Sequence, residues 1–242
     1  MHEQMRFSPM ELTGQSRAHI VDLTDPACSL HHAVVQPFQA MRAAAAADGM
    51  DLVPVSSFRD FDRQLAIWNG KCRGERPLLD QQGQLLDARS LEPDALVAAI
   101  LVWSALPGAS RHHWGTDFDA IDRAAMPEGY RVQLVPAEYA AGGVFARLGH
   151  WLDEHAQRFG FYRPYTTWRG GSQPEPWHLS YAPVATQALA QLTPAVLRAA
   201  LNDVEIEARA AVERQLPQIF ARYVASVDAW PGPAAIPATR PA

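Results

Sequence analysis

The chain has 242 residues, of which 48% are hydrophobic and 19% are charged, and its formal net charge is −5 at pH 7. This composition is typical of a globular protein with one sizeable core, and the negative charge excludes a general nucleic-acid surface, which needs clustered lysine and arginine. No run approaches the roughly 18 apolar residues of a membrane span, and two cysteines, Cys28 and Cys72, are too few for a disulfide framework.

The N-terminal residues give few structural signals. Residues 1–6 carry an acid and no apolar stretch, unlike a secretory signal, which predicts a cytoplasmic location. A misassigned start or a non-standard export route would instead place the protein in the periplasm or at the cell wall. Residues 1–29 have no clean periodicity and are expected to form a surface lead-in. His31 and His32 are expected to be exposed or to cap a helix, because adjacent side chains diverge.

The next segments predict a helix followed by a strand. Residues 37–48 have proline in the first turn and an alanine run, which favour a helix. Residues 51–58 read as a buried strand with Val53 and Val55 on one face. The strand ends at Arg59, which is well placed to reach into a site.

A second helix is expected to begin after Asp60, a suitable N-cap, and to run to about Asn69. Residues 71–89 then form a polar loop punctuated by glycine and proline. Loops of this length often cover a site, so the stretch is expected either to form part of a cleft or to be variable decoration. Pro93 opens a third helix.

The C-terminal half is predicted to be largely helical. Apolar residues at helical spacing cover residues 144–159 and 194–230, and Pro217 is expected to break or kink the second of these helices. Residues 191–230 are therefore expected to form a helical extension that packs on the core. Residues 231–242 are rich in proline and alanine and are predicted to be a disordered tail.

Two stretches carry residues suited to a catalytic metal site. Residues 110–119 read Ser-Arg-His-His-Trp-Gly-Thr-Asp-Phe-Asp, and residues 175–178 read Glu-Pro-Trp-His. A catalytic zinc needs three nitrogen or oxygen ligands and an open position for water, and a nearby carboxylate can take the proton of that water. The expected base is Glu175. The expected ligands are His112, Asp119 and His178.

The spacing of these residues is consistent with one site. Gly115 allows the chain to turn close to the metal before a strand over residues 116–121. Asp117 and Asp119 share one face of that strand, because side chains alternate along it. Pro176 excludes a continuous helix in the second stretch, which is therefore expected to be a turn leading into a strand.

The motif Ser-x-His-x-x-Gly-x-x-x-Asp followed by Glu-x-Trp-His resembles the signature of the VanY/VanX-type zinc peptidases, also called LAS-type metallopeptidases. These are D-alanyl-D-alanine carboxypeptidases and dipeptidases, with L,D-carboxypeptidases and some phage endolysins as relatives. Upstream, residues 57–60 read Ser-Phe-Arg-Asp and resemble a third element of the family, and the resemblance spans residues 51–183. It implies metal ligands at His112, Asp119 and His178, a base at Glu175, an oxyanion-stabilising group at Arg59, and substrate contacts at Gln64 and Ser110.

Two residues in the first stretch leave alternatives open. His113 is expected on an extended segment, pointing away from His112, where it contacts a ligand or forms part of the cleft wall. Asp117 is a departure from the family pattern, which usually has alanine at this position. Its carboxylate is expected to support a metal ligand, to compete for the metal, or to bind a substrate amine.

The resemblance implies an α+β fold, in which a small antiparallel sheet bears the zinc site and helices flank it, within a metallopeptidase domain over residues 1–190. It implies a zinc-dependent carboxypeptidase that removes a C-terminal D-alanine from peptidoglycan-type peptides. In that reaction zinc-bound water, assisted by Glu175, attacks the peptide carbonyl, and Arg59 shares the oxyanion charge. The implied partner is a peptidoglycan-derived peptide, and the oligomeric state stays open.

Other functions fit the same residues. An L,D-carboxypeptidase or a stem-peptide endopeptidase shares the ligand set, so the ligands do not separate these activities. A metal-stabilised binding module without catalysis is the alternative from another class. The free carboxylate of Glu175 argues against it, because a structural zinc site is closed by four ligands and needs no base. Other divalent metals also suit two nitrogens and one oxygen.

Overall fold

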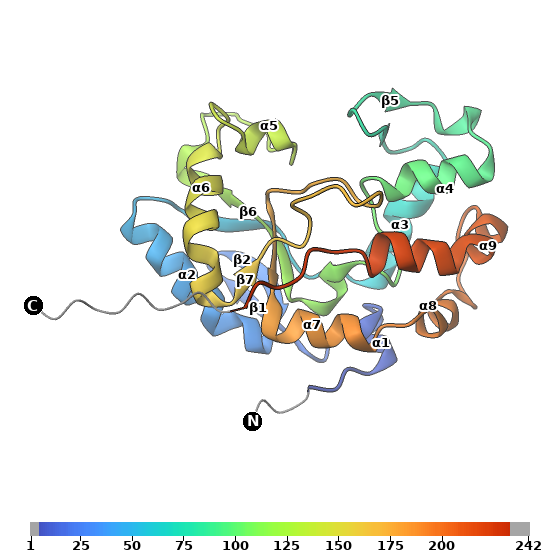
Figure 1. The fold of residues 1–242 in the computed structure, drawn as a ribbon, viewed down its shortest axis with the longest axis horizontal. Helices are drawn as coiled ribbons and strands as arrows, with labels where there is room; N and C mark the ends of the chain where they lie inside the picture. Colours follow the sequence, from blue (N-terminus) through green and yellow to red (C-terminus); the bar gives the residue numbers. More distant parts are fainter. Residues whose placement is uncertain (1–4, 233–242) are drawn as a thin grey trace, which may run out of the picture.

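The computed structural model describes residues 5–232 and has the α+β fold that the sequence predicted (Figure 1). Its centre is a four-stranded antiparallel sheet with the strand order β3-β6-β8-β7. The strands of this sheet are β3 (Leu52–Ser56), β6 (Asp117–Asp122), β7 (Phe161–Tyr162) and β8 (His178–Tyr181). The strands of two separate hairpins are β1 (Ile20–Thr24), β2 (Ala27–His31), β4 (Leu78–Leu79) and β5 (Leu85–Leu86).

Helices surround the sheet, with α2 and α6 on one side of Figure 1 and α3, α4, α8 and α9 on the other. The α-helices of the described residues are α1 (Pro9–Leu12), α2 (Val35–Ala47), α3 (Phe61–Cys72), α4 (Pro93–Leu101), α5 (Pro136–Tyr139), α6 (Ala146–His155), α7 (Ala182–Gln191), α8 (Pro194–Leu201) and α9 (Arg209–Ile219). Within residues 5–232, no helix has the length and apolar character that crossing a membrane requires.

Helices α2 and α6 cover one face of the sheet. Phe38 and Met41 of α2 are fully buried and pack in one cluster with Phe118 of β6. The rings of Phe38 and Phe118 meet edge to face, with their centroids 5.3 Å apart. Because side chains alternate along a strand, Asp117 and Asp119 point to the opposite face, as predicted. The candidate site therefore lies on the face away from α2 and α6.

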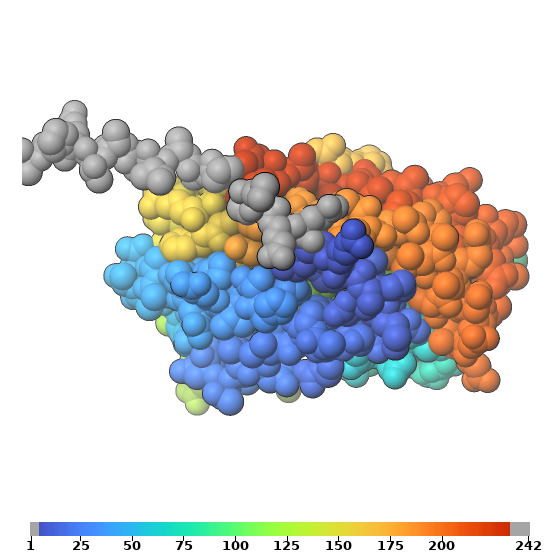
Figure 2. Space-filling view, turned by 90° about the horizontal axis from the view of Figure 1, so that it is seen from below, coloured from blue at the N-terminus to red at the C-terminus, as the bar shows by residue number. Residues whose placement is uncertain are grey.

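The N-terminal residues are part of the fold and not the surface lead-in that the sequence predicted. Trp114 Nε1 donates to Leu12 O at 3.0 Å, and His31 N donates to Gly115 O at 2.8 Å. Phe7 is buried, and Figure 2 shows the dark blue N-terminal segment lying against the orange C-terminal helices. The prediction was wrong because part of what holds the segment is hydrogen bonding to backbone groups, which leaves no apolar periodicity in the sequence.

His31, the last residue of β2, and the adjacent His32 behave as predicted. The His31 side chain accepts a hydrogen bond from Ala33 N at 3.1 Å, at the start of a 3-10 turn, and is itself buried. Burial lowers the pKa of His31 to about 3, so its ring is neutral at physiological pH. His32 is exposed.

Strand β3 is shorter and less regular than predicted. Val53 is buried, whereas Val55 is 44% exposed, so the two side chains do not share a buried face. The pairing with β6 shifts register between Pro54 and Ser56, which interrupts the alternation of the strand. The prediction was wrong here because a bulge leaves no signal in a short apolar run.

Helices α2 and α3 lie close to their predicted positions. Helix α2 begins at Val35, slightly before the predicted start. Asp60 caps α3, as predicted, and its carboxylate accepts a hydrogen bond from Arg63 N at 2.7 Å. The helix continues beyond Asn69 to Cys72, where the sequence offered no strong stop signal.

We expect Asp60→Ala to lower the free energy of unfolding by about 1 kcal/mol, because it leaves a backbone N–H of the first turn without its acceptor. Urea denaturation monitored by circular dichroism measures this loss. Glu92→Ala is the matched control, because Glu92 occupies the N-cap position of α4 and makes no side-chain capping bond. Equal losses in both variants would contradict the capping role of Asp60.

The C-terminal region is helical but is not the single helix predicted over residues 194–230. Helix α8 ends at Leu201 and α9 begins at Arg209, and Ala208 between them has a φ of 56°. No glycine or proline marks this break in residues 202–208, so the residue pattern did not predict it.

Pro217 lies inside α9 and is followed by a π-helical turn over Phe220–Val224. Proline has no N–H to donate and its ring crowds the preceding turn, so a distortion was predicted. The distortion takes the form of a widened turn, and such turns are frequent at functional sites. The tail predicted over residues 231–242 lies, from residue 233 onward, outside the described residues.

Helices α8 and α9 pack on α3 and α4, two helices from the first half of the chain. Leu197 of α8 and Leu216 of α9 are buried in one cluster with Trp68 of α3 and Ile100 of α4. This cluster lies beside the site face of the sheet, and the end of α9 reaches the cavity described below.

Candidate active site

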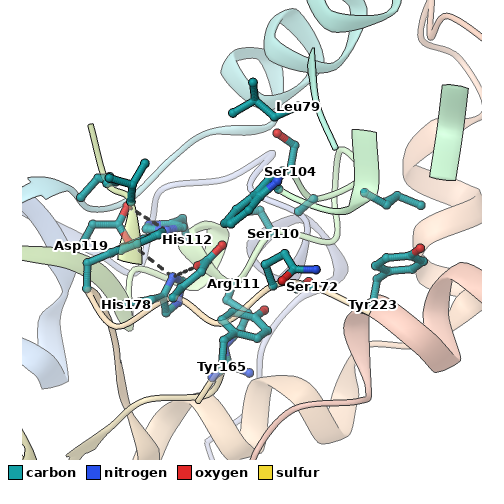
Figure 3. Close-up of a pocket in the computed structure, with 18 of the residues that line it drawn as sticks. Leu79, Ser104, Ser110, Arg111, His112, Asp119, Tyr165, Ser172, His178 and Tyr223 are labelled. Carbon is teal, nitrogen blue, oxygen red and sulfur yellow. Dashed lines mark ion pairs between the residues drawn. The ribbon is translucent and has the colours of Figure 1, made fainter. Parts of the chain in front are cut away.

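The three predicted ligands come together on the site face of the sheet (Figure 3). His112 lies in a 3-10 turn just before β6, Asp119 lies in β6, and His178 is the first residue of β8. Asp119 and His178 are paired across the two strands. One ligand atom from each of the three residues lies within 4.8 Å of the others, and all three residues are buried.

The geometry of the cluster fits a metal ion. His112 Nε2 lies 3.7 Å from Asp119 Oδ2, and His178 Nδ1 lies 3.4 Å from Asp119 Oδ1. Asp119 Oδ1 and His178 Nδ1 are buried, and neither has a hydrogen-bond partner among the described residues. Buried polar atoms are normally satisfied, so two such atoms facing one point are consistent with a site for a cation.

In His112 and His178, the ring nitrogen that faces away from the cluster is within hydrogen-bond distance of another group of the protein. His112 Nδ1 lies 2.9 Å from the carbonyl oxygen of Ser57, and His178 Nε2 lies 3.0 Å from Asp117 Oδ1. Hydrogen bonds of this kind orient a ligating imidazole and fix its tautomer. Burial lowers the pKa of His112 to about 3, which keeps the ring in the neutral form that binds metals. Burial also lowers the pKa of His178, but its contacts with Asp117, Asp119 and Glu175 outweigh this and raise it.

Asp117 forms a buried ion pair behind His178. Its Oδ1 lies 2.7 Å from Arg111 Nε, and its Oδ2 accepts a hydrogen bond from Thr116 Oγ1. Both side chains of the pair are almost fully buried. Burial alone would raise the pKa of Asp117, but Arg111 and His178 lower it well below its usual range. The sequence left three roles open for Asp117. Its contact with His178 favours one of them, the support of a metal ligand.

Arg111 is fixed from several sides. Burial disfavours its charge, but Asp117 offsets this and holds the pKa of Arg111 above its usual value. Its Nη2 donates to Ser180 Oγ at 2.6 Å, and its guanidinium carbon lies 4.8 Å from the centre of the Trp114 ring. Arg111 thus holds the carboxylate of Asp117 in position, and that carboxylate contacts His178 Nε2.

Glu175 stands beside the cluster, in the turn that the sequence predicted. His178 N donates to Glu175 O at 3.1 Å, which closes this turn, and Glu175 N donates to Tyr165 O at 2.8 Å. Glu175 Oε2 lies 3.2 Å from His178 Nδ1. Its side chain is 17% exposed and lines the cavity, so it is accessible to a substrate.

Arg59 also lines the cavity, and Gln64 holds it in place. Arg59 donates from Nη1 to Gln64 Oε1 and from Nη2 to Ser56 Oγ, both at 2.9 Å. Gln64 Nε2 donates to Ala105 O at 2.7 Å, and the Gln64 side chain is fully buried. The structure therefore places Ser110, but not Gln64, on the cavity wall.

His113 lies in the same 3-10 turn as His112 and not on the extended segment that was predicted. It points away from the cluster, as expected. Its Nδ1 donates to Arg59 O at 2.6 Å, and its Nε2 accepts from Gly108 N at 3.1 Å. Burial lowers the pKa of His113 to about 4, so the neutral ring can serve both bonds. His113 thus holds the backbone of Arg59 in position.

Gly115 ends this turn with a φ of 64°, and a Cβ there would lie 2.7 Å from His31 N. We expect Gly115→Ala to cost roughly 2–5 kcal/mol of unfolding free energy, because it adds left-handed strain and a backbone clash. Gly83→Ala is the control, because Gly83 has a φ of 77° but no described heavy atom within 4 Å of such a Cβ. Chemical denaturation should show a clearly smaller loss for the control, and equal losses would contradict the close approach.

A cavity of about 580 Å³ opens in front of the cluster. The connection between β4 and β5 forms part of its wall through residues 81–83, so the stretch 71–89 does contribute to a cleft. Ile219 and Tyr223, from the end of α9 and the π-helical turn, line its far side. Sequence reasoning missed these two residues, because an apolar stripe at helical spacing is equally consistent with simple core packing.

The sequence model of the D-alanyl-D-alanine carboxypeptidase family VanY matches residues 27–184 of this chain. The chain belongs to this family. The resemblance predicted from the motifs is confirmed, and the VanY match contains every predicted site residue, from Arg59 to His178.

Relatives of the chain have been found both among sequences and among solved structures. Two proteins of Haemophilus influenzae (strain ATCC 51907 / DSM 11121 / KW20 / Rd), both described as uncharacterized, are similar to it. One is 47% identical over 105 residues, which is 42% of this chain and 72% of that protein. The other is 37% identical over 121 residues, which is 49% of this chain and 92% of that protein.

Among solved structures, VanYB in complex with D-alanine-D-alanine has a similar fold. It is 24% identical, covers 79% of this chain and 92% of its own, and gives a TM-score of 0.51. At this identity the likeness establishes the VanY-like fold of the chain and nothing about its substrate.

Proposed function

We propose that the protein is a zinc-dependent carboxypeptidase that removes a C-terminal D-alanine from peptidoglycan-type peptides. The proposal is carried by one observation, the convergence of two imidazoles and a carboxylate within 4.8 Å, with the free carboxylate of Glu175 beside them. Membership of the D-alanyl-D-alanine carboxypeptidase family supports the reaction class. The D-alanine-D-alanine bound to VanYB, which has a similar fold, supports that dipeptide as the end of the substrate.

His112, Asp119 and His178 would hold the metal through Nε2, a carboxylate oxygen and Nδ1. Three such ligands and an open position suit zinc, and the same set accepts other divalent ions. A metal bound here lowers the pKa of water and polarises the carbonyl of the scissile peptide bond.

Two side chains beside the metal would then have separate roles, one in proton transfer and one in stabilising the negative charge of the carbonyl oxygen. Glu175 takes the proton of the attacking water and gives it to the nitrogen of the departing alanine as the C–N bond breaks. Arg59, held by Gln64 and Ser56, places its positive charge where the carbonyl oxygen becomes negative. Ser110 lines the cavity and would contact the substrate, whereas Gln64 acts through Arg59.

An L,D-carboxypeptidase or a stem-peptide endopeptidase would use the same groups. A binding module without catalysis would leave the carboxylate of Glu175 without a role. Mass spectrometry of the stem pentapeptide and the stem tetrapeptide after incubation with the protein separates these functions.

Loss of one alanine from the pentapeptide is the result we expect. Loss of an alanine from the tetrapeptide alone would replace the proposal with an L,D-carboxypeptidase, and a cut inside either peptide would replace it with an endopeptidase. If neither peptide is cut, the proposed function is contradicted and the binding module is favoured.

A further inference from the structure

The cavity extends well beyond the metal cluster. Figure 3 places Tyr223 across the pocket from Asp119, with Ser110 and Ser172 between them. We define the distal lobe as the part of the cavity lined by Leu101, Leu106, Ile219, Tyr223 and Val224. These residues also belong to or pack against one hydrophobic cluster, so they form a continuous wall.

The two ends of the cavity differ in charge. The Asp, Glu, Lys and Arg side chains that line the cavity are Arg59, Arg111, Asp119 and Glu175. All four lie at the metal end, where they contact the cluster or the groups that hold it. The distal lobe has aliphatic and aromatic walls. A charged group placed in such a lobe loses hydration without gaining a partner, so an uncharged group is strongly favoured there.

The loop that carries Glu175 contacts both the C-terminal segment and the end of α4, and these contacts hold the distal lobe in a fixed shape. Arg222 donates to Gly170 O, and Gln173 N donates to Val102 O at 3.2 Å. A Cβ on Gly171 would lie only 2.2 Å from Arg222 O, so the loop and the π-helical turn are in direct contact. A preformed pocket loses less conformational entropy when a ligand binds.

A second set of contacts joins the C-terminal segment to the same loop just beyond the π-helical turn. The carboxylate of Asp228 accepts hydrogen bonds from Thr166 N and from Arg169 Nε, both at 2.7 Å. Residues 219–228 therefore shape the wall of the distal lobe and anchor the loop next to it. They lie after the residues that the VanY model matches, 27–184, so part of this wall is built by a segment that the family match does not cover.

We propose that the distal lobe is a substrate subsite for an uncharged, apolar side chain of the peptide, remote from the scissile bond, and that Tyr223 determines this specificity. The proposal rests on the proposed function, since it takes the ligand to be a peptide whose cleaved bond lies at the metal cluster. Tyr223 is half-buried and comes from a widened helical turn, which directs its ring toward the cavity.

The test measures peptide binding to the Glu175→Ala protein, so that it does not depend on turnover. Peptides end in a single D-alanine after the scissile bond and carry either norleucine or lysine at one position at a time, at each of the three residues before that bond. These side chains have similar length and differ in charge. We expect one position away from the bond at which norleucine lowers Kd by about tenfold or more relative to lysine.

Variants of Tyr223 then assign that preference to the distal lobe. In the same background, Tyr223→Phe should keep the preference for norleucine, whereas Tyr223→Glu should reverse it in favour of lysine. Ser172→Glu introduces the same charge from another wall and serves if Tyr223→Glu fails to fold. Leu85→Glu is the control, because Leu85 is 75% exposed and does not line the cavity, and it should leave the preference unchanged.

Equal affinity for norleucine and lysine at every position would overturn this inference, and so would an unchanged preference in both glutamate variants. Either result can occur while the wild-type protein still cleaves the pentapeptide, in which case the proposed function stands. Failure of every peptide to bind would also overturn this inference, and it would overturn the proposed function only if the wild-type protein leaves the pentapeptide uncut as well.

Discussion

Replacing Glu175 by alanine or glutamine should reduce kcat on a cleavable stem peptide by roughly 10²–10⁴-fold, the usual contribution of a positioned general base. Glu175 is the partly exposed carboxylate beside the ligand cluster, and its Oε2 lies 3.2 Å from His178 Nδ1. Without it, no described side chain in this position can accept the proton of the attacking water and return it to the leaving amine.

The measurement pairs steady-state kinetics with the metal content of each variant, because the account separates the base from the ligands. Glu175→Gln should bind the same amount of metal as the wild-type protein. Glu154→Gln is the control, because Glu154 is an exposed glutamate on α6 that pairs with His150. The kcat of this control variant should equal that of the wild-type protein. Full activity in a metal-loaded Glu175→Ala protein would contradict the assignment.

The second large effect is expected from the buried pair of Asp117 and Arg111. Asp117→Ala should lower the free energy of unfolding by about 3–5 kcal/mol, because it leaves the Arg111 charge buried without its partner. It should also weaken zinc affinity by roughly 10–100-fold, because His178 Nε2 loses the carboxylate that orients the ring.

A double variant separates these two contributions. Arg111→Met combined with Asp117→Ala removes both charges and should recover most of the lost stability, since buried pairs can often be replaced by apolar side chains at little cost. The weakened zinc affinity should persist, because the ring of His178 is still without support. Thermal denaturation and a competitive zinc titration measure the two quantities. Normal zinc affinity in the double variant would show that Asp117 does not act on the metal site.

Much of the site could be predicted because its residues are close in sequence to the turns that position them. Gly115 and Pro176 mark turns directly, and alternation along one strand places Asp117 and Asp119 on the same face. The spatial neighbourhood of His112, Asp119 and His178 followed from the family resemblance, and the structure brings these residues together. Their service as metal ligands stays a prediction.

Other features could not be predicted, because they depend on contacts between distant segments. The ion pair of Asp117 with Arg111 was not recognised, since nothing in the motif says which way a buried arginine turns. The N-terminal segment contacts the metal-site turn through the backbone at Leu12 and His31, which leaves no apolar pattern in the sequence.

The C-terminal wall of the cavity shows the same limit. Tyr223 lines the cavity and lies in the π-helical turn that follows Pro217. A proline inside a helical pattern predicts a distortion but does not say whether the helix bends, breaks or widens. The sequence therefore predicted the fold class and the metal motif, and it missed the segment that we propose as a determinant of substrate choice.

The central claim is that one metal ion held by His112, Asp119 and His178 enables peptide hydrolysis. The most direct test removes all metal with a chelator, adds zinc back in measured amounts, and follows cleavage of the stem pentapeptide by mass spectrometry. We predict that cleavage stops in the metal-free protein and is restored in full at one zinc ion per chain. Unchanged cleavage by a protein shown to contain no metal would contradict the account.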